Sequence, residues 1–286
     1  MKLSKDSVHS EDSYFWIPVF YDKNSDIYFC EPESKEFIHK FYQKQYWDNF
    51  WSKRWKLNFL YKFAFFIAHI PDLLNYRNFQ LLKKLWYLKQ DTKILEIWIW
   101  EWKNLIYLKN LWYNIHWIEM DPDNVKRINT HFNEEVIFHW NYEEIEVEWK
   151  YDIIYIRHVL EHFLDLDFVI NNLKNNLNEW WILFIDVPFC ENDFTIKWSI
   201  SEHPHIYHFT RKSLRKYFEE SNFQTLYMEY LVRRNIDISK IDIINKLYIA
   251  ILMLCRKPSY RIGGDFSSDN IYDLVGIFQI NDLWKK

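Results

Sequence analysis

The spacing of hydrophobic positions changes at about residue 91. Beyond it, short apolar runs bounded by turn residues alternate with stretches whose apolar residues recur at helical spacing. Such alternation predicts a parallel sheet with helices on both faces. The predicted strands are 93–98, 114–119, 135–139, 151–156 and 182–188, and the predicted helices between them are 102–111, 122–131 and 165–177.

The remaining parts of the chain extend this core. A helix at 211–221 precedes a strand at 223–231, and a last strand at 272–279 is predicted to insert antiparallel beside it. The N-terminal part combines a short extended stretch with helices rich in Phe and Tyr, which predicts a helical cap near the carboxyl ends of the strands. We therefore divide the chain into a cap at 1–75 and an α/β domain at 76–286, with a helical insertion at 236–262.

The composition departs from that of ordinary proteins in one pair of residues. The 286 residues include 16 Trp and only 3 Gly. Ordinary usage of about 7% would give roughly 20 glycines. Tight turns and helix ends need glycine because they require positive φ. Trp86 and Trp112 each follow a Leu at the end of a helix-like segment, which is the position where glycine is favoured.

We interpret most of these tryptophans as glycines of the natural protein. The codon UGA is read as Trp in one variant genetic code and as Gly in another, so translation with the wrong table would produce this exchange. Under this interpretation Trp47 and Trp284 remain tryptophan, and the other 14 become glycine. The alternative is a chain genuinely rich in Trp, such as an aromatic carbohydrate-binding module.

Charge, cysteine content and apolar run length exclude several classes of protein. With 36 basic and 40 acidic residues, the net charge of −4 gives no indication of a dedicated nucleic-acid surface. The three cysteines form no C-x-x-C pair, which favours a reducing compartment. The polar N-terminus predicts no signal peptide, and no apolar run reaches the ~18–20 residues of a transmembrane helix. We therefore expect a cytoplasmic protein, and the sequence leaves its oligomeric state open.

The first chemical motif is Ile94-Leu-Glu-Ile-Trp-Ile-Trp-Glu-Trp-Lys103. With glycines restored it reads I-L-E-I-G-I-G-E-G-K, a strand followed by a glycine loop and a helix start. It resembles motif I of the class I S-adenosylmethionine-dependent methyltransferases, of the type that acts on small molecules. This resemblance implies a doubly wound, Rossmann-like, mostly parallel sheet of seven strands. It also implies that S-adenosylmethionine is bound by Glu96, near its amino-acid end, and by the loop positions Trp98, Trp100 and Trp102.

Two further motifs extend the resemblance along the next strands. Glu119 ends the second strand, 21 positions after Trp98, where a carboxylate can accept hydrogen bonds from both ribose hydroxyls. The resemblance places Met120 against the adenine. Asn141, followed by Tyr142, stands where the family has a polar residue that contacts the adenine amine, although Asp is commoner there than Asn.

The segment at the end of the fourth strand, Ile156-Arg-His-Val-Leu-Glu-His162, resembles a family segment that ends in Leu-Glu-His. Arg157 and His158 would lie at the carboxyl end of this strand, the edge where open α/β sheets bind ligands, and the resemblance counts both among the cofactor-binding residues. His158 would either contact the cofactor or pack beneath it.

A histidine-rich segment, 202–214, resembles the family pattern H-x-x-F-T-x-x-S-L. Because His titrates near neutral pH, we name His205, His208 and His162 as candidate catalytic bases. The spacing of His203, His205 and His208 does not fit a helical pair of metal ligands, so we predict no metal site.

These motifs together predict an S-adenosylmethionine-dependent methyltransferase. The acceptor would be a small molecule, and sugars and lipid-linked molecules are the classes considered. A non-catalytic protein that retains the fold is the alternative.

Overall fold

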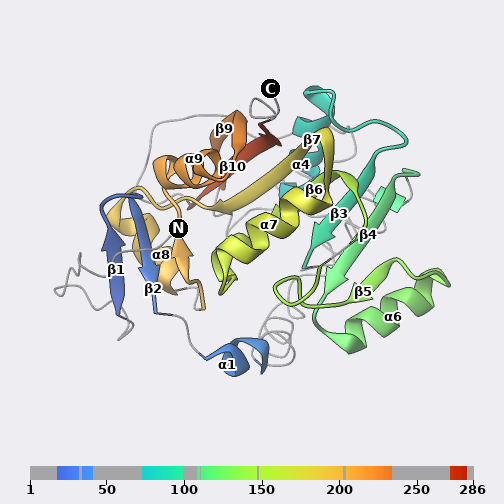
Figure 1. The fold of residues 1–286 in the computed structure, drawn as a ribbon, viewed down its shortest axis with the longest axis horizontal. Helices are drawn as coiled ribbons and strands as arrows, with labels where there is room; N and C mark the ends of the chain where they lie inside the picture. The colour runs from blue at the N-terminus through green and yellow to red at the C-terminus, as the bar shows by residue number, and fades with distance from the viewer. Residues whose placement is uncertain are drawn as a thin grey trace, which may run out of the picture.

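Seven strands form one sheet in the computed structural model (Figure 1). The structure describes residues 18–31, 34–40, 73–98, 108–109, 111–146, 148–201, 204–233 and 271–281. The strand order is β5-β4-β3-β6-β7-β10-β9. The bounds are β3 Lys93–Ile97, β4 Asn114–Glu119, β5 Ile137–His139, β6 Tyr151–Arg157, β7 Leu177–Pro188, β9 Phe223–Arg233 and β10 Ile271–Ile280.

The directions of the strands confirm the predicted topology. β5, β4, β3, β6 and β7 are parallel to one another. β10 lies between β7 and β9 and is antiparallel to both. The fold is therefore a mostly parallel, Rossmann-like sheet of seven strands, as the sequence predicted.

Helices cover both faces because each parallel strand sends alternate side chains to opposite sides. In β6, Ile154 and Ile156 belong to one buried cluster, and Ile153 and Tyr155 belong to another. The first cluster packs against α7 (Leu166–Asn176) and α9 (Arg211–Glu220), and the second against α4 (Leu73–Lys84) and α6 (Pro122–Phe132).

The predicted turn before the fifth strand is a bulge within β7. Tyr151 of β6 pairs with Leu177, but Ile153 pairs with Ile182, so four residues of β7 have no partner in this ladder. Trp180 lies in this bulge with φ of 70°. The strand therefore begins at Leu177, earlier than the sequence predicted.

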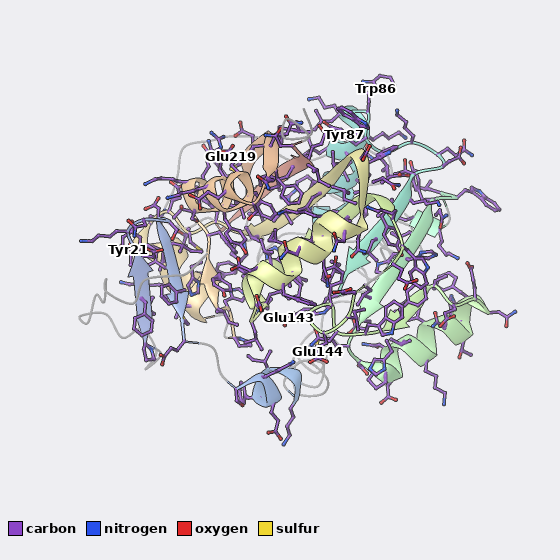
Figure 2. The ribbon with its side chains drawn as sticks, viewed as in Figure 1. Tyr21, Trp86, Tyr87, Glu143, Glu144 and Glu219 are labelled. Atoms are coloured by element: carbon purple, nitrogen blue, oxygen red, sulfur yellow. The ribbon has the colours of Figure 1, made fainter. Side chains whose placement is uncertain are left out.

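The described N-terminal residues form strands as well as a helix. β1 (Val19–Asp22) and β2 (Ile27–Cys30) make an antiparallel hairpin, which β8 (Tyr207–His208) extends to three strands. α1 (Lys35–Lys40) follows, and Lys35 forms an ion pair with Glu144, labelled in Figure 2. The boundary predicted between residues 75 and 76 falls inside α4. Most of the predicted cap and the insertion at 236–262 lie outside the described residues.

Tryptophan stands at positions where the backbone needs glycine. After α4, Trp86 has φ of 64°, its N–H donates to Lys83 O at 3.1 Å, and the Tyr87 N–H donates to Leu82 O at 3.0 Å. This pair of bonds is the Schellman motif, which ends helices with a left-handed residue, usually glycine. Figure 2 labels Trp86 at the rim of the molecule, and 81% of its surface is exposed.

The same geometry recurs at Trp112. Its φ is 64°, its N–H donates to Lys109 O, and the Tyr113 N–H donates to Leu108 O. Eight non-glycine residues of the described part have positive φ: Asp26, Trp86, Trp98, Trp112, Asn133, His158, Trp180 and Asn222. Four of the nine described tryptophans are among them, although bulky residues rarely adopt this conformation. The backbone thus has the form that the glycine interpretation requires.

Among the described residues, no helix has the length and apolar character needed to cross a membrane.

Candidate functional site

Polar side chains gather at the carboxyl ends of β3, β4 and β5, which lie side by side in the sheet. Glu96 and Glu119 are both buried there. Glu119 Oε1 accepts hydrogen bonds from the backbone N–H groups of Met120 at 2.7 Å and Asp121 at 2.9 Å. These bonds fix the carboxylate at the strand end. Asp121 then caps α6 through bonds from the N–H groups at its first turn.

The end of β5 is tied to the end of β4. The His139 Nε2 lies 3.0 Å from the Met120 carbonyl oxygen, and the Trp140 N–H donates to Glu119 O at 3.1 Å. Asn141 follows directly, and its Oδ1 accepts a bond from the Glu143 N–H at 3.2 Å. The amide of Asn141 is therefore held in a turn beside the Glu119 strand end.

Tyr142 has a contact that explains it without a cofactor. Its side chain is fully buried, and its hydroxyl donates to Asn176 Oδ1 of α7 at 2.7 Å. Burial raises the pKa of this phenol well above its ordinary value. Its proposed place in the cofactor site stays a prediction that this geometry does not favour.

Two indoles lie among the residues predicted to hold the cofactor. The Trp117 Nε1 donates to Glu96 Oε2. Trp98 has φ of 57°, and its ring packs 5.2 Å from that of Phe163 in the same buried cluster as Met120. Trp100 and Trp102 lie outside the described residues.

The hydrogen-bond acceptors at these strand ends fit S-adenosylmethionine, whereas the indoles do not. Carboxylate oxygens at the ends of β3 and β4 suit the ammonium and ribose hydroxyl donors of the cofactor, and the Asn141 amide can accept from the adenine amine. A glycine at position 98 would leave space at the strand end that the printed chain fills with a buried indole. The site and the backbone conformation thus point to the same exchange.

The end of β6 lies in a buried network of charges. His158 has φ of 50°, and its N–H donates to Asp186 O at 2.7 Å. Its Nδ1 lies 3.5 Å from Glu161 Oε1, and its Nε2 lies 3.4 Å from Asp273 Oδ1. Burial alone would lower the pKa of His158, but the Asp273 and Glu161 carboxylates outweigh it and raise the pKa to about 9.

Arginines neutralise the carboxylates of the same network. Arg157 Nε lies 3.6 Å from Asp186 Oδ2. From α4, Arg77 lies 3.4 Å from Asp186 and 3.5 Å from Asp273. Sequence reasoning missed Arg77, Asp186 and Asp273. Two of them carried a signal, because each Asp is a lone acid within an apolar strand run.

The three histidines named as bases lie together and are buried. His208 Nε2 lies 3.3 Å from Cys30 Sγ, and its Nδ1 lies 2.8 Å from Ser199 Oγ. Since both ring nitrogens are engaged, His208 is the least suited of the three to take a proton from a substrate. The rings of His162 and His205 have centroids 4.6 Å apart.

Burial lowers the pKa of each of these three rings. The pKa of His208 falls to about 3, that of His205 falls well below its usual value, and that of His162 falls by less because the Glu161 charge opposes the shift. All three rings are therefore neutral at pH 7, which is the form that can accept a proton or bind a metal.

Comparison with known proteins identifies the family. A family model described as a methyltransferase domain matches residues 73–227, more than half of the chain. The chain belongs to this methyltransferase family. It is a class I methyltransferase whose methyl donor is S-adenosylmethionine. No curated protein is similar enough in sequence to count as a relative.

Solved structures share the fold at low sequence identity. The methyltransferase resembles the Burkholderia thailandensis 1,6-didemethyltoxoflavin-N1-methyltransferase, with a TM-score of 0.52 and 10% identity over 96% of this chain and 100% of that one. It also resembles a Clostridium acetobutylicum S-adenosylmethionine-dependent methyltransferase, with a TM-score of 0.51 and 10% identity over 82% and 99% of the two chains. At these identities the likenesses show the fold alone.

Proposed function

We propose that this methyltransferase transfers the methyl group of S-adenosylmethionine to a small-molecule acceptor. The observation that carries the proposal is the buried Glu119 carboxylate, fixed by two backbone N–H groups at the end of β4. The Burkholderia enzyme of the same fold was solved with bound 1,6-didemethyltoxoflavin and S-adenosylhomocysteine, which supports an acceptor of that size class. Sugars and lipid-linked molecules are the first acceptors to test.

The proposed roles of the residues follow from their places at the strand ends. Glu119 accepts hydrogen bonds from the ribose hydroxyls, and Asn141 accepts one from the adenine amine. Met120 packs against the adenine, and Glu96 receives the amino-acid end. The positions 98, 100 and 102 supply backbone that approaches the ligand closely, which glycine allows and a side chain prevents.

The cofactor supplies an electrophilic methyl group on a sulfonium. The chain must therefore hold the acceptor in line with it and, for a hydroxyl or amine, provide for loss of a proton. His162 and His205 are the proposed groups for that task, since their neutral rings lie side by side next to the end of β6. Arg157 and His158, proposed to lie on the cofactor side of the site, are held there by ion pairs with Asp186 and Asp273.

The test is calorimetry with S-adenosylhomocysteine on wild type, taken as the chain with glycine restored at the 14 interpreted positions, and on its Glu119→Gln variant. Loss of the carboxylate should weaken binding at least tenfold, because ribose hydroxyls lose a charged acceptor. Glu134→Gln is the matched control, since Glu134 is an exposed carboxylate paired with Lys109 on the surface. Equal affinity of wild type and Glu119→Gln would overturn the proposed cofactor site.

A second measurement separates the enzyme from a non-catalytic protein with the same fold. Formation of S-adenosylhomocysteine is followed with candidate acceptors present and absent. Turnover that requires an acceptor supports methyl transfer. Tight cofactor binding with no turnover on any sugar, lipid-linked or small aromatic acceptor favours the non-catalytic alternative.

A further inference from the structure

A carboxylate and two imidazoles converge beside the end of β6. Glu161 and His162 belong to the short helix η3 (Leu160–His162), and His205 comes from the segment before β8. The Nε2 atoms of His162 and His205 each lie 3.9 Å from Glu161 Oε1, and one ligand atom from each residue lies within 4.8 Å of the others. The spacing of histidines along the sequence could not predict this group, because Glu161 and His162 lie far from His205 in the chain.

The carboxylate has few partners for its charge. Glu161 is fully buried, and within the described residues neither of its oxygens receives a hydrogen bond. Burying a charge without compensation is costly. The His158 imidazole lies beside it, with Nδ1 3.5 Å from Oε1. One imidazole at this distance leaves room beside the Glu161 carboxylate for another positive group.

The outer contacts of the two imidazoles turn their Nε2 atoms toward Glu161. The His162 Nδ1 lies 3.4 Å from the Pro204 carbonyl oxygen, which can only accept, so Nδ1 carries the proton of the neutral ring and Nε2 carries the lone pair. A carbonyl or hydroxyl bonded to the far nitrogen is the usual outer contact of a metal-binding histidine.

His205 has an outer contact of the same kind. Its Nδ1 lies 3.1 Å from Ser199 Oγ, which in turn lies 2.8 Å from His208 Nδ1. When this hydroxyl donates to His208, the His205 Nδ1–H donates to the hydroxyl, and the lone pair of His205 Nε2 faces Glu161. Ser199 and His208 thus orient the ring of His205 through Nδ1 and leave its Nε2 atom toward Glu161.

We propose that Glu161, His162 and His205 bind a divalent first-row transition metal. Two imidazoles and one carboxylate form a catalytic zinc set and also the facial triad of iron enzymes, whereas Mg²⁺ and Ca²⁺ prefer oxygen ligands. A metal about 2 Å from each ligand holds the ligand atoms about 3–4 Å apart, which agrees with the separations of 3.9 Å. The backbone bond from the Ile206 N–H to Glu161 O, 2.7 Å long, keeps the two segments together.

Such a metal would have a clear chemical use at this edge of the sheet. It would lower the pKa of a bound hydroxyl, and the metal would then replace His162 and His205 as the group that provides for loss of the proton. The metal site itself does not depend on the proposed acceptor, so binding is measured without cofactor or acceptor.

The experiment titrates Zn²⁺ into the metal-stripped, tag-free, full-length protein by calorimetry and follows the melting temperature. We expect one Zn²⁺ per chain that Glu161→Gln and His205→Ala weaken at least 100-fold. Ser199→Ala should weaken it about 10–100-fold, as loss of an outer contact does. His131→Ala, which removes an exposed histidine of α6, should leave binding unchanged.

Glu161→Gln preserves the shape of the side chain, and circular dichroism checks the folding of every variant. Absence of Zn²⁺ binding to the folded wild type overturns the proposal and leaves His158 as the partner of Glu161. Equal binding by wild type and folded Glu161→Gln overturns it too. Loss of the Zn²⁺-dependent rise in melting temperature in the variants supports it, whatever the result with S-adenosylhomocysteine.

Discussion

Two pairs of helix ends in this protein have the same backbone and different residues. Asn133 after α6 and Asn222 after α9 have φ of 50° and 62°, and their N–H groups donate to the carbonyls three residues earlier. Trp86 after α4 and Trp112 before β4 have φ of 64° and the same bonds. Asn tolerates the left-handed region because its short polar side chain can bond locally, but an indole has no such means.

The left-handed backbone at Trp86 and Trp112 therefore follows from the surrounding helix and strand and not from a conformational preference of tryptophan. Their indoles are 81% and 84% exposed and so gain little from packing. Only the glycine interpretation gives these two ends a local reason for their conformation. The codons of the gene test this interpretation directly. We expect UGA at positions 86, 98, 112 and 180, and UGG at these positions would contradict it.

The largest expected effect is at the cofactor site. Replacing Trp98, Trp100 and Trp102 together with Gly should raise affinity for S-adenosylhomocysteine at least tenfold, because a buried indole leaves the end of β3. Calorimetry on the printed and the substituted chains measures the change. Trp86→Gly, remote from the strand ends that carry Glu96 and Glu119, is the control and should leave this affinity unaltered. Equal affinity and equal melting temperature for the printed and the triply substituted chain would show that the indoles belong there.

A smaller gain is expected in stability at the two tryptophan helix ends. Trp86→Gly and Trp112→Gly should each raise the free energy of unfolding by about 1 kcal/mol, since left-handed conformation costs a residue with a Cβ about 1–2 kcal/mol and glycine returns part of this as unfolded-state entropy. Urea denaturation measures both. Trp86→Ala keeps the Cβ, so a gain equal to that of Trp86→Gly would attribute the effect to the indole and contradict the φ argument.

The smallest effect is expected at the asparagine ends. Asn133→Gly and Asn222→Gly should change the free energy of unfolding by no more than about 0.5 kcal/mol, because Asn already tolerates this conformation. The same denaturation series provides the measurement. A gain as large as that of Trp86→Gly would show that Asn and Trp are equally unfavourable at these helix ends. It would contradict the argument that tryptophan stands in place of glycine there.

The core of the fold followed from local patterns. Parallel strands covered by helices on both faces are rich in apolar residues, and the predicted bounds of β4, 114–119, agree with the structure at both ends. Helix caps also use residues that are close in sequence: Asp121 with Pro122 after it caps α6, and Thr210 caps α9. The bulge in β7 was not predicted, since it depends on the register with β6.

The sequence alone predicted the methyltransferase family, the mostly parallel sheet of seven strands and the antiparallel placement of the last strand beside 223–231. These depend on short stretches in which a strand, a turn and a polar residue follow one another. Only the tertiary structure decided which charges share a buried space. Arg77, Asp186 and Asp273 lie on α4, β7 and β10, and Glu161 meets His205 across two segments. Such groups are placed by the packing of distant elements, so no local spacing could have shown them.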